Sequence, residues 1–232
     1  MAAGGDKVGA VIVAAGKGQR MGGVDKVFSP IGGRPLIAWV LDAFQGSPSV
    51  DEVVVVLGAW CLERGRGLVG EGNWTKATAI CEGGDRRQDS VREGLGRLSD
   101  CRWAIIHDGA RPCVTPSLIE KVLAAAVESG AAIAAVPVTD TIKAASEDGF
   151  ILGTPERDGL WAAQTPQAFR YDLICEAHRR PVNGAWDDSL LVEELGHRVK
   201  VSMGAYDNIK VTTPQDLALA EVLLGKRCHG EG

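Results

Sequence analysis

The first residues whose side chains could take part in binding or catalysis are three cations, Lys17, Arg20 and Lys26. They lie in or beside a glycine-rich turn. The glycines of this turn are Gly16, Gly18, Gly22 and Gly23. Glycines allow backbone N–H groups to point into one concavity, and such a concavity binds anions. The apolar run before the turn, residues 11–15, predicts a strand buried on both faces. A buried strand that runs into a cationic glycine loop indicates phosphate binding; a plain strand-to-loop turn with solvated charges is the alternative.

Two familiar glycine motifs do not fit this turn. A Walker A loop has the pattern G-x-x-x-x-G-K-[ST], and Gly18 and Gly23 have its spacing, but Val24 and Asp25 follow instead. A dinucleotide-binding fingerprint, G-x-G-x-x-G, is broken at Met21. The next expected strand, residues 53–57, also ends without the acidic residue that would bind a ribose. An NAD-dependent dehydrogenase is therefore disfavoured.

Two further stretches place polar residues after expected strands. The first is GGDRRQDS at residues 83–90, where Asp89 or Ser90 can cap the following helix. Ser90 also lies where it could contact a ligand, and ligand contact and helix capping are equally open interpretations. The second is Asp108, which follows the expected strand at residues 103–107. Open α/β sheets bind ligands at the carboxyl ends of their strands, and a carboxylate there is a natural Mg²⁺ ligand. Asp108 would otherwise cap the next turn or pair with Arg111.

Strands and helices alternate along most of the chain. The expected strands are residues 11–15, 53–57, 77–81, 103–107, 131–136 and 199–203. The expected helices are residues 35–45, 116–129, 171–178 and 214–224, together with a helix after GGDRRQDS that carries Val91, Leu95 and Leu98 on one face. The glycine-rich residues 61–73 predict a poorly formed helix or a loop. Either Asp187 or Asp188 is expected to cap a helix that runs to residue 195. This order predicts an α/β fold, with a mainly parallel twisted sheet and helices on both faces, as one domain over residues 1–232.

Residues 139–164 interrupt the alternation. They contain two Asp-Gly turns and little apolar periodicity, which are hairpin signals. A segment that cannot bury itself in its own core often reaches a partner. We therefore expect a protruding β-arm for dimerisation, with a solvated hairpin as the alternative.

Composition narrows the class of protein. The net charge of -5 argues against a general nucleic-acid surface. No apolar run approaches the roughly 20 residues of a membrane span, and residues 1–7 lack the apolar stretch of a signal peptide. The six cysteines form no C-x-x-C pair, so neither a zinc site nor a disulfide framework is indicated. We expect a cytoplasmic protein with no nucleic-acid partner and no membrane partner.

Five stretches in order resemble the 2-C-methyl-D-erythritol 4-phosphate cytidylyltransferase family of the non-mevalonate isoprenoid pathway. They are AAGKGQRM with Lys26, GGDRRQDS, HDGARP, TDTIK together with QTPQ, and DNIKVT. The resemblance runs from residue 8 to residue 224. It implies a Rossmann-like nucleotidyltransferase that acts as a homodimer on CTP and a polyol phosphate, with Mg²⁺ as cofactor. It also implies direct in-line attack by the acceptor phosphate on the α-phosphorus of CTP, and a plastid location if the source is plant-type.

The resemblance also implies roles for individual residues. Arg20, Lys26 and Lys210 would hold the triphosphate and stabilise the transition state, and Asp108 would bind the metal. The residues implied for cytidine, ribose and the nucleotide rim are Ala14, Ala15, Gly16, Gly18, Gly84, Asp85, Ser90, Gly109 and Arg111. The residues implied for methylerythritol phosphate are Thr141, Arg157, Thr165 and Asp207, of which the first two come from the partner's arm.

Two positions depart from the family's usual pattern. Trp186 stands where the family usually has Thr before the acidic pair, and Gly109 stands where Ala is common. Trp186 leaves room for a closely related alternative, a ribitol 5-phosphate cytidylyltransferase. An alternative of another class is a nucleotide-binding module without catalysis. The joint presence of Arg20, Lys26 and Lys210 argues against it, because binding alone needs fewer aligned cations.

Overall fold

The structure is a computed structural model that describes residues 5–16, 26–180 and 186–228. Lys17, Gly18 and Arg20, which belong to the expected phosphate loop, lie outside the described residues. Their predicted roles therefore remain predictions. No helix in the described ranges combines the length and apolar character needed to cross a bilayer.

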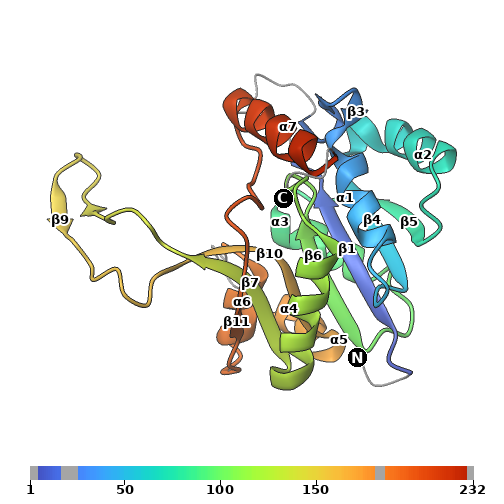
Figure 1. The fold of residues 1–232 in the computed structure, drawn as a ribbon. Helices are drawn as coiled ribbons and strands as arrows, with labels where there is room; N and C mark the ends of the chain where they lie inside the picture. Colours follow the sequence, from blue (N-terminus) through green and yellow to red (C-terminus); the bar gives the residue numbers. More distant parts are fainter. Residues whose placement is uncertain (1–4, 17–25, 181–185, 229–232) are drawn as a thin grey trace.

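A seven-stranded sheet forms the centre of the described part (Figure 1). Its strands, in spatial order, are β11 (Lys200–Met203), β7 (Ala131–Pro137), β10 (Trp161–Arg170), β6 (Trp103–Asp108), β1 (Val8–Ala14), β4 (Glu52–Leu57) and β5 (Ala77–Glu82). Only β10 runs antiparallel to its neighbours, β6 and β7; the remaining neighbours pair in parallel. The predicted mainly parallel sheet is confirmed, but β10 was not predicted as a strand.

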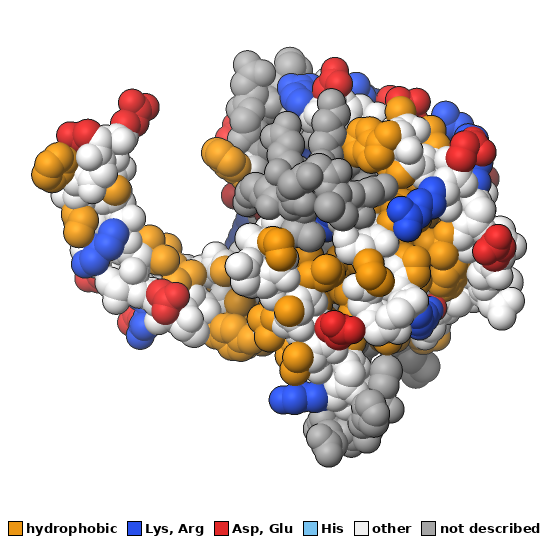
Figure 2. Space-filling view, turned by 90° about the horizontal axis from the view of Figure 1, so that it is seen from above, with side chains coloured by type: hydrophobic (Ala, Val, Ile, Leu, Met, Phe, Trp, Pro, Cys, Tyr) orange, Lys and Arg blue, Asp and Glu red, His pale blue; other side chains and the backbone are white. Residues whose placement is uncertain are grey.

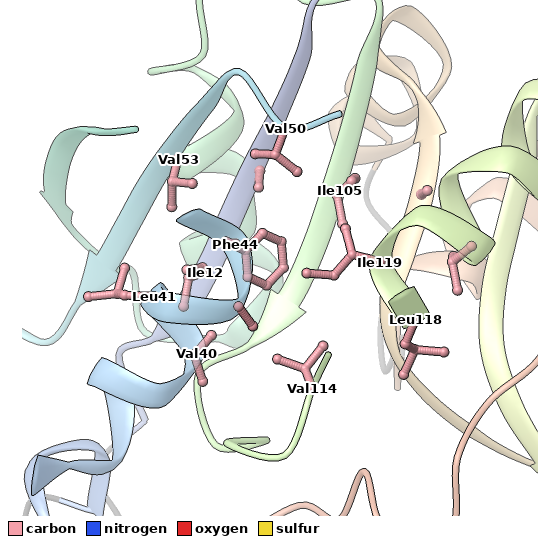
Figure 3. Close-up of a cluster of buried hydrophobic side chains, with 14 of the residues drawn as sticks. Ile12, Val40, Leu41, Phe44, Val50, Val53, Ile105, Val114, Leu118 and Ile119 are labelled. Carbon is pink, nitrogen blue, oxygen red and sulfur yellow. The ribbon is translucent and has the colours of Figure 1, made fainter. Parts of the chain in front are cut away.

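Helices cover both faces of the sheet. One face packs against α1 (Leu36–Gln45), α2 (Leu62–Glu71) and α4 (Pro116–Ser129), and the other against α3 (Arg87–Leu95), α5 (Tyr171–Arg179) and α6 (Asp188–Glu193). Successive strand residues point to opposite faces, so neighbouring apolar residues of β1 serve different cores. Ile12 belongs to the first core and Val11 to the second. Figure 3 shows Phe44 of α1 between Ile12 and Ile105 in the first core.

The last helix and a short hairpin complete the body. The helix is α7 (Pro214–Cys228), and the hairpin is formed by β2 (Pro30–Ile31) and β3 (Arg34–Pro35). Two 3-10 turns, η2 (Lys26–Phe28) and η3 (Ala59–Cys61), precede β2 and α2. A third, smaller apolar core joins Ala220 and Leu224 of α7 to Ile31 and Leu36. This core places α7 over the carboxyl ends of the strands rather than over a sheet face (Figure 1).

The expectation of a loop or poor helix at residues 61–73 was wrong, because Leu62–Glu71 form a regular helix. The glycine at position 65 allows this helix to lie close to the sheet. A Cβ atom added to Gly65 would lie 2.1 Å from Cδ1 of Leu57 in β4. Glycine costs helix stability, but here it permits close approach of α2 to the strand.

The strands β7 and β10 enclose the segment that interrupts the alternation. Residues 161–164 lie in β10, where Trp161 pairs with Pro137, so the segment outside the sheet is residues 138–160. We call these residues the arm. Figures 1 and 2 show the arm extending away from the body, and Figure 2 shows hydrophobic side chains along much of it. It carries one short antiparallel pair, β8 (Ala144–Ala145) with β9 (Ile151–Gly153).

Candidate active site

The carboxyl ends of the central parallel strands bring three loops together. Val13 of β1 lies in register with Asp108 of β6, and the N–H of Gly109 donates to the carbonyl of Val13 at 2.8 Å. The loop after β5 reaches the same edge, because a Cβ atom on Gly83 would lie 2.4 Å from that of Ala15. The predicted nucleotide-binding residues at the end of β1 change from the buried Ala14 to the exposed Gly16. This edge is the place where open α/β sheets bind ligands.

Asp108 is the centre of a cluster of charges at this edge. Its Oδ1 accepts a hydrogen bond from Nε of Arg87 at 3.0 Å, and its Oδ2 lies 2.6 Å from Nζ of Lys210. Burial alone would raise the pKa of the Asp108 carboxyl, but the charges of Arg87 and Lys210 outweigh burial and lower that pKa well below its usual range. Asp108 is therefore ionised at neutral pH, although it is only 7% exposed.

Arg87 continues the charge cluster into the protein interior. Its NH1 donates to Oδ2 of Asp188 at 2.7 Å, and Nε2 of His178 lies 3.1 Å from the other oxygen of Asp188. The Asp188 side chain has no exposed surface. Burial alone would lower the pKa of Arg87, but the two carboxylates raise it above its ordinary value. Arg87 thus remains charged and joins two buried acids from distant parts of the sequence.

A second network fixes the backbone beneath Asp108. His107 is fully buried, and burial lowers its pKa to about 4, so its ring is neutral at pH 7. Its Nδ1 lies 3.1 Å from Oγ1 of Thr165, which accepts the N–H of Asp108 at 3.0 Å. Nε2 of His107 lies 3.3 Å from the carbonyl of Arg111. A proton on Nε2 satisfies every group, because Thr165 then donates to Nδ1 and His107 donates to Arg111.

The loop after β11 brings Lys210 to Asp108. The N–H of Val211 donates to the carbonyl of Ala110 at 2.8 Å, and NH1 of Arg111 donates to the carbonyl of Asn208 at 2.8 Å. Asn208 is fully buried, and its Nδ2 donates to the carbonyl of Thr165 at 2.9 Å. These bonds hold the loop across the end of β6. The same loop carries Asp207, which forms an ion pair with Arg227 of α7.

The turn after β5 corrects the predicted helix cap, because the N-cap residue is Arg86 and both Asp89 and Ser90 lie inside the helix. Helix α3 begins at Arg87, so Asp89 is its third residue, and the carboxylate of Asp89 accepts the N–H of Arg86 at 3.3 Å. Asp89 therefore caps the helix from inside its first turn. The buried hydroxyl of Ser90 donates to the carbonyl of Arg86 at 3.2 Å. Gly84 and Asp85 lie on the turn itself, where both are exposed.

The other predicted residues occupy different places. Lys26 opens η2 and is partly buried. Thr141 and Arg157 are exposed on the arm, and NH1 of Arg157 donates to the carbonyl of Thr139 at 2.5 Å. Within the part of the chain that the structure describes, neither arm residue bonds to Asp108. One chain therefore assembles Asp108, Lys210, Arg111 and Thr165, but not the arm residues.

Sequence reasoning gave no role to Arg87 or His178 and saw Asp188 only as a possible cap. The helix cap is Asp187, whose side chain accepts the N–H of Leu190. The sequence contained part of the signal for the Arg87 network. Asp108 and Asp188 both lie near expected buried elements, and buried acids require cations as partners. Arg87 stood in the quoted GGDRRQDS stretch, but its partners lie 21 and 101 residues away.

A charge cluster and converging loops at the carboxyl ends of a mostly parallel sheet are typical of α/β proteins that bind nucleotides at this edge. The model of the family described as 2-C-methyl-D-erythritol 4-phosphate cytidylyltransferase matches residues 8–226. The chain belongs to this family.

Individual relatives agree with the family match. A protein of that name from Dehalococcoides mccartyi is 50% identical over 221 residues, which cover 95% of this chain and 97% of the relative. The crystal structure of the protein of that name from Thermus thermophilus has a TM-score of 0.76 at 35% identity, covering 93% of this chain and 98% of that one. The crystal structure of 4-diphosphocytidyl-2C-methyl-D-erythritol synthase from Anaerococcus prevotii has a TM-score of 0.83 at 30% identity, covering 95% and 99%.

Proposed function

We propose that this protein transfers the cytidylyl group of CTP to 2-C-methyl-D-erythritol 4-phosphate and releases pyrophosphate. The observation that carries the proposal is the ionised Asp108, held between Arg87 and Lys210 at the strand ends of a chain of this family. Both substrates are polyanions, so their approach must be assisted by fixed positive charge. Cations and oriented N–H groups at the strand ends supply it.

The reaction needs no covalent intermediate with the protein. A phosphate oxygen of the acceptor attacks the α-phosphorus of CTP, a new P–O bond forms, and the bond to the pyrophosphate oxygen breaks in line with it. Lys26, Lys210 and Arg20 are assigned to the triphosphate, where they offset the charge on the bridging and leaving oxygens. The turn with Gly84 and Asp85, together with residues 14–16, is assigned to cytidine and ribose.

Asp108 suits a magnesium ion shared with the nucleotide. Mg²⁺ commonly takes one or two protein carboxylates and fills its other positions with phosphate oxygens and water. The described residues hold no cluster of three His, Cys, Asp or Glu side chains that would form an all-protein site. One ionised carboxylate beside a phosphate site is the donor set that such a shared ion uses. When bound, the ion would neutralise phosphate charge, and Asp108 would anchor it.

The arm is assigned to a homodimer in which each site receives Thr141 and Arg157 from the partner. Three consecutive arm residues, Phe150, Ile151 and Leu152, are 72%, 63% and 72% exposed in the single chain. Apolar side chains exposed in a row favour an interface over a solvated hairpin. The arginine would then bind the acceptor's phosphate.

The test is pyrophosphate release by the purified protein with CTP, MgCl2 and either 2-C-methyl-D-erythritol 4-phosphate or ribitol 5-phosphate. We expect turnover with the first acceptor, and much less with the second. Preference for ribitol 5-phosphate would replace the acceptor but keep the chemistry. Binding of CTP without pyrophosphate release from either acceptor would refute catalysis and favour a nucleotide-binding module.

A further inference from the structure

The last turn of α7 lies against two loops of the candidate site. One loop is residues 109–114, which follow β6 and carry Arg111, and the other is residues 204–213, which follow β11 and carry Asp207 and Lys210. NH1 of Arg227 donates to the carbonyl of Cys113 in the first loop at 2.7 Å. NH2 of the same guanidinium pairs with Oδ2 of Asp207 in the second loop. One side chain therefore joins both loops.

The position of Arg227 is set by the packing of its helix. Ala220 and Leu224 of α7 are buried with Cys113 and Val211, one from each loop. Elsewhere on the helix, Oε1 of Glu221 accepts the N–H of Gly32 in the β2–β3 hairpin at 3.1 Å. A helix held by an apolar core presents its last turn in a fixed orientation. The guanidinium is thus directed to Asp207 by the fold and not by the ion pair alone.

The ion pair leaves one oxygen of Asp207 available. In the described part of the chain, Oδ2 is held by Arg227 while Oδ1 has no hydrogen-bond partner, and the side chain is 40% exposed. An ionised carboxylate accepts hydrogen bonds and donates none, so it suits the hydroxyl groups of a polyol. Without a cation beside it, the same carboxylate would repel the phosphate of that polyol. Arg227 removes that conflict and fixes the orientation of Oδ1.

We propose that Arg227 is a positioning residue that holds Asp207 for the hydroxyl groups of the phosphorylated acceptor, which makes the end of α7 part of the acceptor site. This inference rests on the proposed function. Arg227 lies one residue beyond the region of the family match, which ends at residue 226. Arg227 acts through Asp207, and the residue that touches the acceptor is Asp207.

The first test compares Arg227→Gln and Arg227→Lys with the control Lys226→Gln, which changes a cation on the same helical turn. We expect Arg227→Gln to raise the KM for the polyol phosphate about tenfold, because the charge-assisted bond that Arg227 makes to Asp207 is lost. The KM for CTP should stay within about twofold. The melting temperature should fall by less than about 3 °C, because the ion pair is partly exposed. Arg227→Lys should restore only part of the effect, since an ammonium group lacks the planar fork that reaches both loops.

The second test combines Arg227→Gln with Asp207→Asn. If Arg227 acts through Asp207, the double variant should have the same KM for the polyol phosphate as Asp207→Asn alone. Three outcomes would each overturn the inference. In the first, the effects of the two substitutions on the KM for the polyol phosphate multiply in the double variant. In the others, Arg227→Gln leaves that KM unchanged or raises the KM for both substrates equally. A wild-type protein that releases no pyrophosphate with any acceptor would instead refute the proposed function, and the acceptor role of Asp207 would fall with it.

Discussion

Replacing Asp188 with Asn should destabilise the protein by removing a buried charge without changing the shape of the side chain. Asp188 accepts a hydrogen bond from NH1 of Arg87 at 2.7 Å and lies 3.1 Å from Nε2 of His178, and its side chain has no exposed surface. Removing one member of a buried ion pair costs about 3–5 kcal/mol. Arg87 keeps Asp108 as a partner and is 27% exposed, so we expect the lower end, about 3 kcal/mol.

Thermal unfolding followed by circular dichroism measures this effect. For a chain of this size, each kcal/mol shifts the melting temperature by about 2–4 °C, so the expected fall is about 6–12 °C. The matched control is Asp172→Asn on α5, where the carboxylate pairs with Arg170 and both side chains are more than half exposed. That pair is worth about 0–1 kcal/mol. Equal shifts in the two variants would refute the reasoning.

The same variant has a predictable pH dependence. Burial alone would raise the pKa of Asp188, but the charge of Arg87 and the hydrogen bond from His178 lower that pKa below its ordinary value. A carboxyl with a lowered folded-state pKa stabilises the protein fully above its unfolded pKa, about 3.9, and loses that contribution as the pH falls through the folded value. The stability gap between wild type and Asp188→Asn should therefore be widest near pH 7 and should narrow below about pH 4. A gap that widens toward acid would contradict the assignment.

Three further outcomes are expected. Lys210→Ala should lower turnover about 100- to 1,000-fold, as removal of a transition-state donor does, whereas Lys200→Ala, in a surface pair, should leave turnover unchanged. Replacing the exposed Phe150 and Leu152 with Ser should shift the protein from dimer to monomer in light scattering; an unchanged mass would exclude the arm as the interface. EDTA should abolish pyrophosphate release and excess Mg²⁺ should restore it, so full turnover in EDTA would refute the metal role of Asp108.

The elements predicted correctly were those whose pattern is local. Residues 103–106 form a continuous apolar run, and they became part of a fully buried central strand, β6. The failures had tertiary causes. Glycines made residues 61–73 a poor helix by propensity, and only contact with Leu57 shows that Gly65 favours close packing. The strand β10 contains Gln164, Thr165 and Pro166, which break any apolar alternation, and it exists because β6 and β7 pair with it on both sides.

In the candidate site, too, local patterns were predicted and contacts between distant residues were not. Asp108 was predicted because a carboxylate at the end of a buried strand is visible in a short stretch of sequence. Arg87 was not, because its function is defined by two partners distant in the chain. The hydroxyl of Thr165 was expected at the substrate, whereas the structure engages it with His107 and the backbone of Asp108. A hydroxyl's partners depend on the exact placement of neighbouring strands, which no local pattern specifies.

Arg87 and Lys210 both pair with Asp108, but their surroundings give them different capacities. Arg87 also binds the buried Asp188, so moving it would leave two buried carboxylates without their cation. The Lys210 side chain is 42% exposed, and Asp108 is its ion-pair partner in the described residues. Water can solvate a half-exposed ammonium, so moving Lys210 away from Asp108 would cost less than moving Arg87.

This difference suggests how the site can accept a triphosphate without losing its structure. Arg87 remains in place and keeps Asp108 ionised, because its charge lowers the pKa of that carboxyl against the effect of burial. In the proposed reaction a phosphate would recruit Lys210, and its departure would free Oδ2 of Asp108 for another positive charge. On this proposal, Asp108 would pair with one fixed cation, Arg87, and one exchangeable cation, Lys210, until a phosphate binds.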